Sequence, residues 1–213
     1  MQALDKISFS NNWITILFVF LLLLIAILKG MNQQKLFGYT RAFFIKGFIV
    51  QKTTERTSFF SVFNLIIFFL SSIVLAITLT FFVEFFLEYS VSFLFFTKLY
   101  GFVLVYLIAI FLVRKSIGVL FEIQSEVNYL YTTIVAYLYN TSLLLFPILI
   151  VVNYSIVSTY FLFWSFVLLF ILSALLLLVN NKNLIISKLF YFILYLCALE
   201  IAPLLIIYKI TVK

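Results

Sequence analysis

The sequence lacks histidine altogether, and it contains a single cysteine, Cys197, and a single aspartate, Asp5. Zinc and di-iron sites of the usual kind need histidine or clustered cysteine ligands, and haem is commonly held by histidine. Ser–His pairs, Cys–His pairs and aspartyl dyads cannot form within this chain, and neither can a disulfide. We therefore expect no catalytic residue, no metal site and no cofactor.

Charge is scarce as well, since 10% of the 213 residues are charged and 66% are hydrophobic. Soluble domains average about 25% charged and about 45–50% apolar residues, and one of this length could not bury so much apolar surface. The apolar runs are unbroken and lack the alternation of an outer-membrane β-barrel. The composition therefore predicts an all-α, polytopic transmembrane helix bundle, with residues 1–213 forming a single integral membrane domain.

A helix needs about 20 residues to cross a bilayer, and six apolar segments have that approximate length. We expect spans near 12–28, 58–83, 92–113, 129–152, 156–179 and 184–208. The first is not a signal peptide, because Lys29 follows it directly and no small-residue cleavage site precedes that lysine. The short connection at residues 153–155 predicts that the fourth and fifth spans are antiparallel neighbours.

The net charge of +7 is mainly a signal of orientation. Most lysines and arginines fall on one side of the six expected spans, and this side should be cytoplasmic. We therefore expect a multi-pass protein of the bacterial inner membrane with both termini in the periplasm. Because the positive charges flank the spans, membrane lipids are the expected partners, and nucleic acid is not.

The longest stretch between spans, residues 29–57, is basic and aromatic. We expect a helix on the cytoplasmic face, with segment 36–50 either interfacial or re-entrant. Basic amphipathic segments commonly bind membrane surfaces, so lipid anchoring is favoured over docking of a protein partner. The residues of this basic segment that would face lipid or a partner are Lys35, Arg41, Lys46, Lys52 and Arg56.

Two charged residues fall inside expected spans, where a charge is costly unless a partner or the headgroups stabilise it. Lys98 lies roughly 9 Å from the start of the third span, and Glu200 lies roughly 12 Å from the end of the sixth. Those two ends lie on the same side, so we predict an intramembrane ion pair between Lys98 and Glu200. A packing contact between helices is favoured over a proton or ion relay. In the alternative, Lys98 extends its ammonium group to the lipid headgroups.

Pro147 and Pro203 each remove a backbone donor from an expected span and predict helix kinks. A polar stripe also runs along the fourth span, with spacings i, i+4, i+7 and i+8. Such a stripe should face other helices, where its side chains can form hydrogen bonds. It consists of Thr133, Tyr137, Asn140 and Thr141.

Several features in order resemble a known family. They are a short first span, Lys35-Leu36-Phe37-Gly38-Tyr39, then Arg114-Lys115, and finally Leu199-Glu200-Ile201-Ala202-Pro203. This order resembles uncharacterised Bacteroidota inner-membrane proteins that are classed as a domain of unknown function, over nearly the whole chain. The family has no established enzymatic activity, and its phylum carries type 9 secretion and gliding-motility machinery. The resemblance implies association with such a complex, and Glu200 and Pro203 are the positions it carries over.

Three functions are compatible with these residues. The favoured hypothesis is a non-enzymatic subunit or assembly factor of a larger inner-membrane complex, with other integral membrane proteins as partners. The alternative is a small proton- or ion-coupled transporter or channel that uses Glu200 and Lys98, with help from Asn140. An enzyme acting on lipids is the least favoured, because histidine and intramembrane aspartate are absent, although Glu, Lys and Tyr can still catalyse proton transfer.

Overall fold

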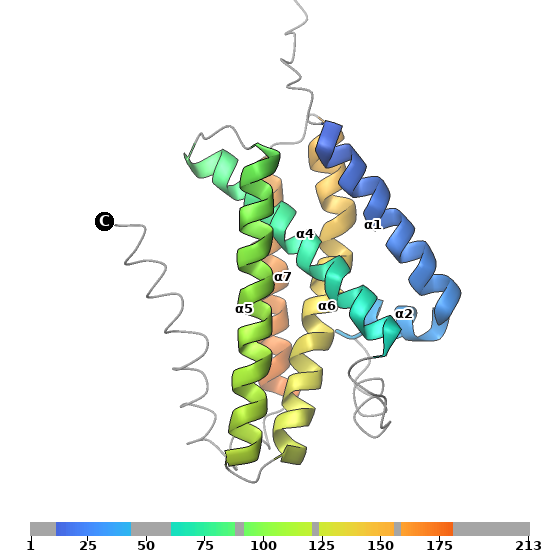
Figure 1. Cartoon of the computed structure of the whole chain (residues 1–213), viewed down its shortest axis with the longest axis vertical. Helices are drawn as coiled ribbons and strands as arrows, with labels where there is room; N and C mark the ends of the chain where they lie inside the picture. The colour runs from blue at the N-terminus through green and yellow to red at the C-terminus, as the bar shows by residue number, and fades with distance from the viewer. Residues whose placement is uncertain (1–11, 44–60, 88–91, 121–123, 156–158, 181–213) are drawn as a thin grey trace, which may run out of the picture.

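The computed structural model describes residues 12–43, 61–87, 92–120, 124–155 and 159–180. Within these residues the chain forms helices and no strand, which confirms the predicted all-α class for this part of the protein. The helices are α1 (Asn12–Met31), α2 (Gln33–Thr40), α4 (Val62–Leu87), α5 (Phe93–Leu120), α6 (Gln124–Tyr154) and α7 (Thr159–Asn180) (Figure 1).

Five of these helices are long and apolar enough to cross a membrane, so the chain has the character of a multi-pass membrane protein. The candidate spans are Trp13–Met31, Val62–Leu87, Phe93–Leu112, Tyr129–Tyr154 and Thr159–Asn180. They agree with the first five spans expected from the sequence. The sixth, at 184–208, lies outside the described residues. Helices suit this setting because they pair nearly all of their backbone polar groups internally.

The second span begins and ends about one turn later than the sequence suggested. It was expected at 58–83, whereas α4 runs from Val62 to Leu87. The expected segment stops just before Glu84, the only charged residue in α4. The helix continues past it because Phe85, Phe86 and Leu87 extend the same apolar segment.

The helices α4 and α6 form the centre of the described bundle. About half of the residues in their apolar windows are buried, 56% in α4 and 50% in α6, against 22% in α1 and 11% in both α5 and α7. The two central helices contact each other, and α5 and α7 each contact both of them. Helix α1 packs against α4 (Figure 1). The outer helices therefore keep most of their apolar surface on the outside.

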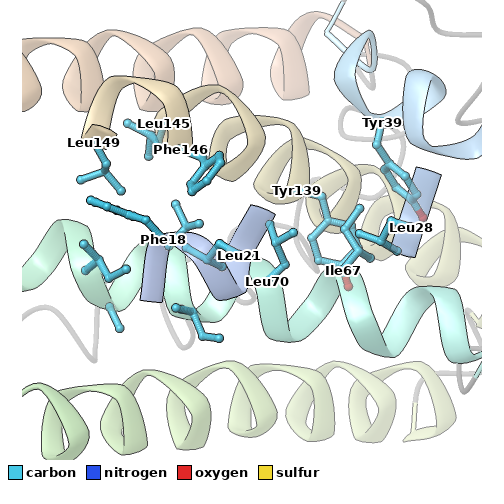
Figure 2. Close-up of a cluster of buried hydrophobic side chains, with 14 of the residues drawn as sticks. Phe18, Leu21, Leu28, Tyr39, Ile67, Leu70, Tyr139, Leu145, Phe146 and Leu149 are labelled. Atoms are coloured by element: carbon cyan, nitrogen blue, oxygen red, sulfur yellow. The ribbon is translucent and has the colours of Figure 1, made fainter. Parts of the chain in front are cut away.

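Apolar side chains from α1, α4 and α6 meet in the core (Figure 2). The Phe18 ring from α1 lies edge-on to the Phe146 ring of α6, with ring centroids 6.2 Å apart. Such a pair adds about 0.5–1.5 kcal/mol beyond the burial of its area in soluble proteins. Fully buried residues of this core include Leu21, Leu28, Ile67, Leu70, Leu145 and Leu149.

The core face of α4 also contains four buried hydroxyl side chains. Each donates a hydrogen bond to a carbonyl three or four residues earlier in α4, at 2.8 to 2.9 Å. They are Ser71, Ser72, Thr78 and Thr80. Because their polar groups are satisfied within the helix, neighbouring helices can pack on them as they would on small apolar residues.

The end of α6 is joined to two other helices. Helix α7 begins five residues after α6 ends, and the two helices are antiparallel and in contact, as the short connection predicted (Figure 1). Asn153 and Tyr154 were expected in that connection but belong to α6. The Tyr154 hydroxyl donates to Thr15 Oγ1 at 2.8 Å and so links this end of α6 to the start of α1.

Replacement of a central leucine tests the role of the α4 core face. We expect Leu70→Ala to lower the stability of the detergent-solubilised protein by about 2–5 kcal/mol, because it leaves a cavity at a fully buried position. The matched control is Leu65→Ala on the same helix, where the side chain is 37% exposed. Thermal unfolding in one detergent compares them, and equal losses for both variants would contradict this placement of the core.

Candidate functional site

The four residues of the polar stripe are all buried on α6. Their exposed fractions are 1% for Thr133 and Tyr137, 0% for Asn140 and 8% for Thr141. The Thr133 hydroxyl donates to the Tyr129 carbonyl within α6, at 2.9 Å. Tyr137 and Asn140, by contrast, form hydrogen bonds with other helices, so they are the members of the stripe that join parts of the fold.

One of their neighbours is the short helix α2. It begins at an N-cap, Asn32, whose side-chain oxygen accepts a hydrogen bond from the Lys35 amide at 2.9 Å. Asparagine is a favoured N-cap because it satisfies an amide that has no partner within the helix. Leu36 and Tyr39 are three residues apart and therefore share the buried face, whereas Phe37 is exposed.

Asn140 holds the other end of α2. Its Nδ2 donates to the Tyr39 carbonyl at 2.7 Å, across 101 residues of sequence. Carbonyls in the last turn of a helix have no partner further along that helix. The Tyr39 carbonyl accepts from the Ala42 amide at 3.2 Å, and Asn140 adds a second donor from a distant helix. The amide oxygen of Asn140 is buried and accepts no hydrogen bond from any described residue.

Aromatic rings surround this contact. The Tyr39 ring stacks on Phe63 of α4 at 6.2 Å and lies edge-on to Tyr139 of α6 at 5.4 Å. The Phe43 ring, just beyond α2, lies edge-on to Tyr137 at 5.4 Å. We call this group, together with Asn140, the α2–α6 junction.

A second amide completes the junction from α7. Asn180 Nδ2 donates to the Tyr137 hydroxyl at 2.7 Å, which ties the last residue of α7 to α6. Tyr39 was named from the sequence only as part of the Lys35–Tyr39 motif, and Tyr139 and Asn180 were not named. Asn180 offered a weak signal, as an amide directly after an apolar run. Tyr139 offered none, because tyrosine is frequent throughout the chain.

The chemistry available at the junction is hydrogen bonding and aromatic packing. Its polar side chains are phenols and amides, which do not change charge near neutral pH. Among the described residues, no group of three or more His, Cys, Asp or Glu side chains could hold a metal ion. The arrangement is suited to anchoring α2 between α1 and α6, both of which it contacts.

The basic segment is described in part. Arg41 is exposed and Lys35 is half-buried, while Leu36 and Tyr39 of α2 pack into the bundle. Lys46, Lys52 and Arg56 lie outside the described residues. The expected helix of the 29–57 stretch is therefore present over Gln33–Thr40, where one face joins the core of the protein. Whether its basic face contacts lipid or a partner stays a prediction.

The remaining predicted residues lie apart from the junction or outside the described residues. Lys98 is exposed on α5, and Pro147 lies inside α6 with its ring exposed. Glu200 and Pro203 lie outside the described residues, so the ion pair between Lys98 and Glu200 and the kink at Pro203 stay predictions.

Removal of the Asn140 amide tests the anchoring of α2. We expect Asn140→Leu to loosen α2 by about 0.5–1.5 kcal/mol, because the Tyr39 carbonyl would lose its donor from α6 and keep the Ala42 amide. Hydrogen exchange of the α2 amides in detergent measures the change. The matched control is Tyr137→Phe, which removes the hydroxyl that accepts from Asn180 on α7. Equal loosening of α2 in both variants would contradict a specific cap at Asn140.

Comparison with protein families gives a match over most of the chain. No curated protein and no solved structure matches the chain. A family model described as "Domain of unknown function (DUF4271)" matches residues 14–211, which include every helix described above apart from the first two residues of α1. The chain therefore belongs to the DUF4271 family.

Proposed function

We propose that this protein is a non-enzymatic integral subunit or assembly factor of a larger complex in the bacterial inner membrane. The proposal is supported by the arrangement of the described helices. Two central helices carry the core, and three outer helices keep most of their apolar surface outside. Such surfaces are available to other transmembrane helices, which associate through close side-chain packing.

The outward face of α1 is the observation that carries the proposal. Much of this face is apolar and exposed, including Val19, Leu22 and Met31. Within it, four residues are spaced by four, three and four positions, as in the packing seam of a coiled coil. They are Ile16 (67% exposed), Phe20 (46%), Leu23 (53%) and Ile27 (41%). Lipid chains can cover any apolar face, but a regular row with branched side chains and one aromatic ring is suited to a second helix. We therefore assign this face, the α1 seam, to a partner helix.

The opposite face of α1 shows why the helix can present such a seam. Ile14, Phe18, Leu21 and Leu28 are buried against the bundle, with spacings of four, three and seven positions, about half a turn away from the outer row. The inner row, together with the Thr15–Tyr154 hydrogen bond, fixes the rotation of α1 about its axis. The outer row is thus held in one orientation, which lowers the entropic cost of binding a partner.

The complex itself is proposed from the resemblance noted above. In a Bacteroidota cell, this proposal places the protein in or beside the type 9 secretion or gliding-motility machinery, with both termini in the periplasm. Deletion of the gene in a gliding member of that phylum tests this part. We expect less type 9 cargo in the medium and slower spreading of colonies. Normal secretion and normal spreading would contradict a role in this machinery. The broader proposal of a membrane subunit would then depend on the crosslinking experiment below.

Site-specific photocrosslinking tests the α1 seam. With benzoylphenylalanine at position 20 in intact cells, we expect an adduct to one membrane protein of defined mass, because a partner helix would lie on that face. Leu23→Ala should weaken this adduct, whereas Leu172→Ala on the outward side of α7 should not. Both leucines are exposed, at 53% and 37%. Adducts to lipid alone, or an adduct that Leu23→Ala leaves unchanged, would contradict a partner on this seam.

A small ion-coupled transporter is a second candidate, favoured by the place of Lys98 within the apolar span of α5. Ionisable residues inside spans often mark ion pathways. In this function Glu200 and Lys98 would exchange a proton or bind the ion. Proton uptake by reconstituted vesicles would then occur with the natural protein and be abolished by Glu200→Gln, and uptake that is insensitive to this substitution would exclude the role.

A further inference from the structure

A second outward row runs along α5. Its residues are four, four, three, four and three positions apart, so they share one face of the helix. We call this row the α5 seam, and its members, Leu94, Lys98, Phe102, Val105, Ala109 and Leu112, are all exposed. Phe96 and Val103, which are buried, mark the opposite side of the helix. The seam is therefore open to a neighbour along most of the apolar part of α5.

Lys98 distinguishes this seam from an ordinary lipid-facing surface. It lies five residues after Phe93, about 7.5 Å along the helix, between Leu94 and Phe102 on the same face. A lysine among apolar side chains in a membrane is costly unless a counter-charge or the headgroups are within reach. Lys98 forms no ion pair with any of the described residues. A partner of the α5 seam should therefore bring a carboxylate to this depth.

We propose that the α5 seam is covered by the chain's own segment 184–208, with Glu200 paired to Lys98. The directions of the helices support this occupant. Helices α5 and α7 begin at the same end of the bundle, and α7 runs to the opposite end, where Asn180 lies (Figure 1). An apolar segment that follows α7 and crosses the membrane runs back toward the end where α5 begins.

The depths of the two charges agree on this path. Glu200 is eight residues before Tyr208, at the expected end of the segment, or about 12 Å along a helix. Lys98 is about 7.5 Å from the start of α5 at that same end. The difference is less than one helical turn, and the two side chains have opposite charges. The segment also contains no other acidic residue.

Gly101 gives the seam room for a close neighbour. It follows Lys98 by three residues, and a Cβ atom built at this glycine would meet nothing within 4 Å. Small residues allow transmembrane helices to approach closely, so a helix can lie against α5 next to the lysine. The proposal is independent of the α1 seam and of any partner protein.

Disulfide formation with the natural Cys197 tests the docking. Cys197 lies three residues before Glu200, and Gly101 lies three residues after Lys98. In antiparallel helices these positions reach the same depth. In Gly101→Cys, membranes treated with a mild oxidant should form an intramolecular disulfide, which requires Cα atoms within about 7 Å. Phe102→Cys, at an exposed position beside Gly101, is the second reporter in case the first variant does not accumulate.

Ala109→Cys is the matched control on the same seam, because it lies eight residues, or about 12 Å, beyond Gly101. It should form the intramolecular disulfide about tenfold more slowly or not at all, since the local concentration of Cys197 there is low. Peptide mass spectrometry identifies the bond. Three outcomes would overturn the docking. They are equal rates at positions 101 and 109, no disulfide at either reporter, and a disulfide only between two copies of the chain.

Charge reversal tests the ion pair separately. With Gly101→Cys present, Lys98→Glu should slow formation of the disulfide about tenfold. Two carboxylates would then repel each other, and the effective concentration of Cys197 at position 101 would fall. Adding Glu200→Lys should restore the rate. A disulfide rate that neither substitution changes would overturn the ion pair. Failure of the double charge reversal to restore the rate would overturn it as well.

Discussion

The packing of α4 directly against α6 is the contact on which the other described helices depend. Helices α5 and α7 each rest on both members of this pair, and α1 rests on α4. The pair can approach closely because the buried hydroxyls of α4 are bonded within their own helix. In a membrane there is little hydrophobic drive between apolar helices, so complementary shape has to supply the attraction.

Helix α2 shows what such a bundle needs in order to accept a short polar element. A helix of eight residues leaves half of its backbone groups without partners along the helix, and these groups are costly to bury. Asn32 supplies an acceptor at one end of α2, and Asn140 supplies a donor at the other. The aromatic rings of Tyr39 and Phe63 then close the space around the joint. Arg41, which directly follows α2, can remain exposed because the buried face of α2 is fixed in this way.

Composition and apolar run length were enough to predict the all-α class and the first five spans. The predicted stripe of Thr133, Tyr137, Asn140 and Thr141 is buried, because helical spacing alone determines which residues share a face. The partner of Asn140 could not be predicted, since a backbone carbonyl 101 residues away leaves no trace in the sequence. The second span was placed about one turn too early, because the apolar run of α4 continues beyond Glu84 to Leu87.

The two ways of satisfying buried polar groups imply an order of assembly. The hydroxyls of α4 need nothing from other helices, so α4 can enter the bilayer alone, with all of these groups already bonded. Asn140 instead needs the end of α2, which precedes α6 in the chain and is therefore synthesised first. When α6 is synthesised, the Tyr39 carbonyl that accepts from Asn140 is already present. The Nδ2 donor of Asn140 can therefore be satisfied as soon as α6 enters the membrane, without any later part of the chain.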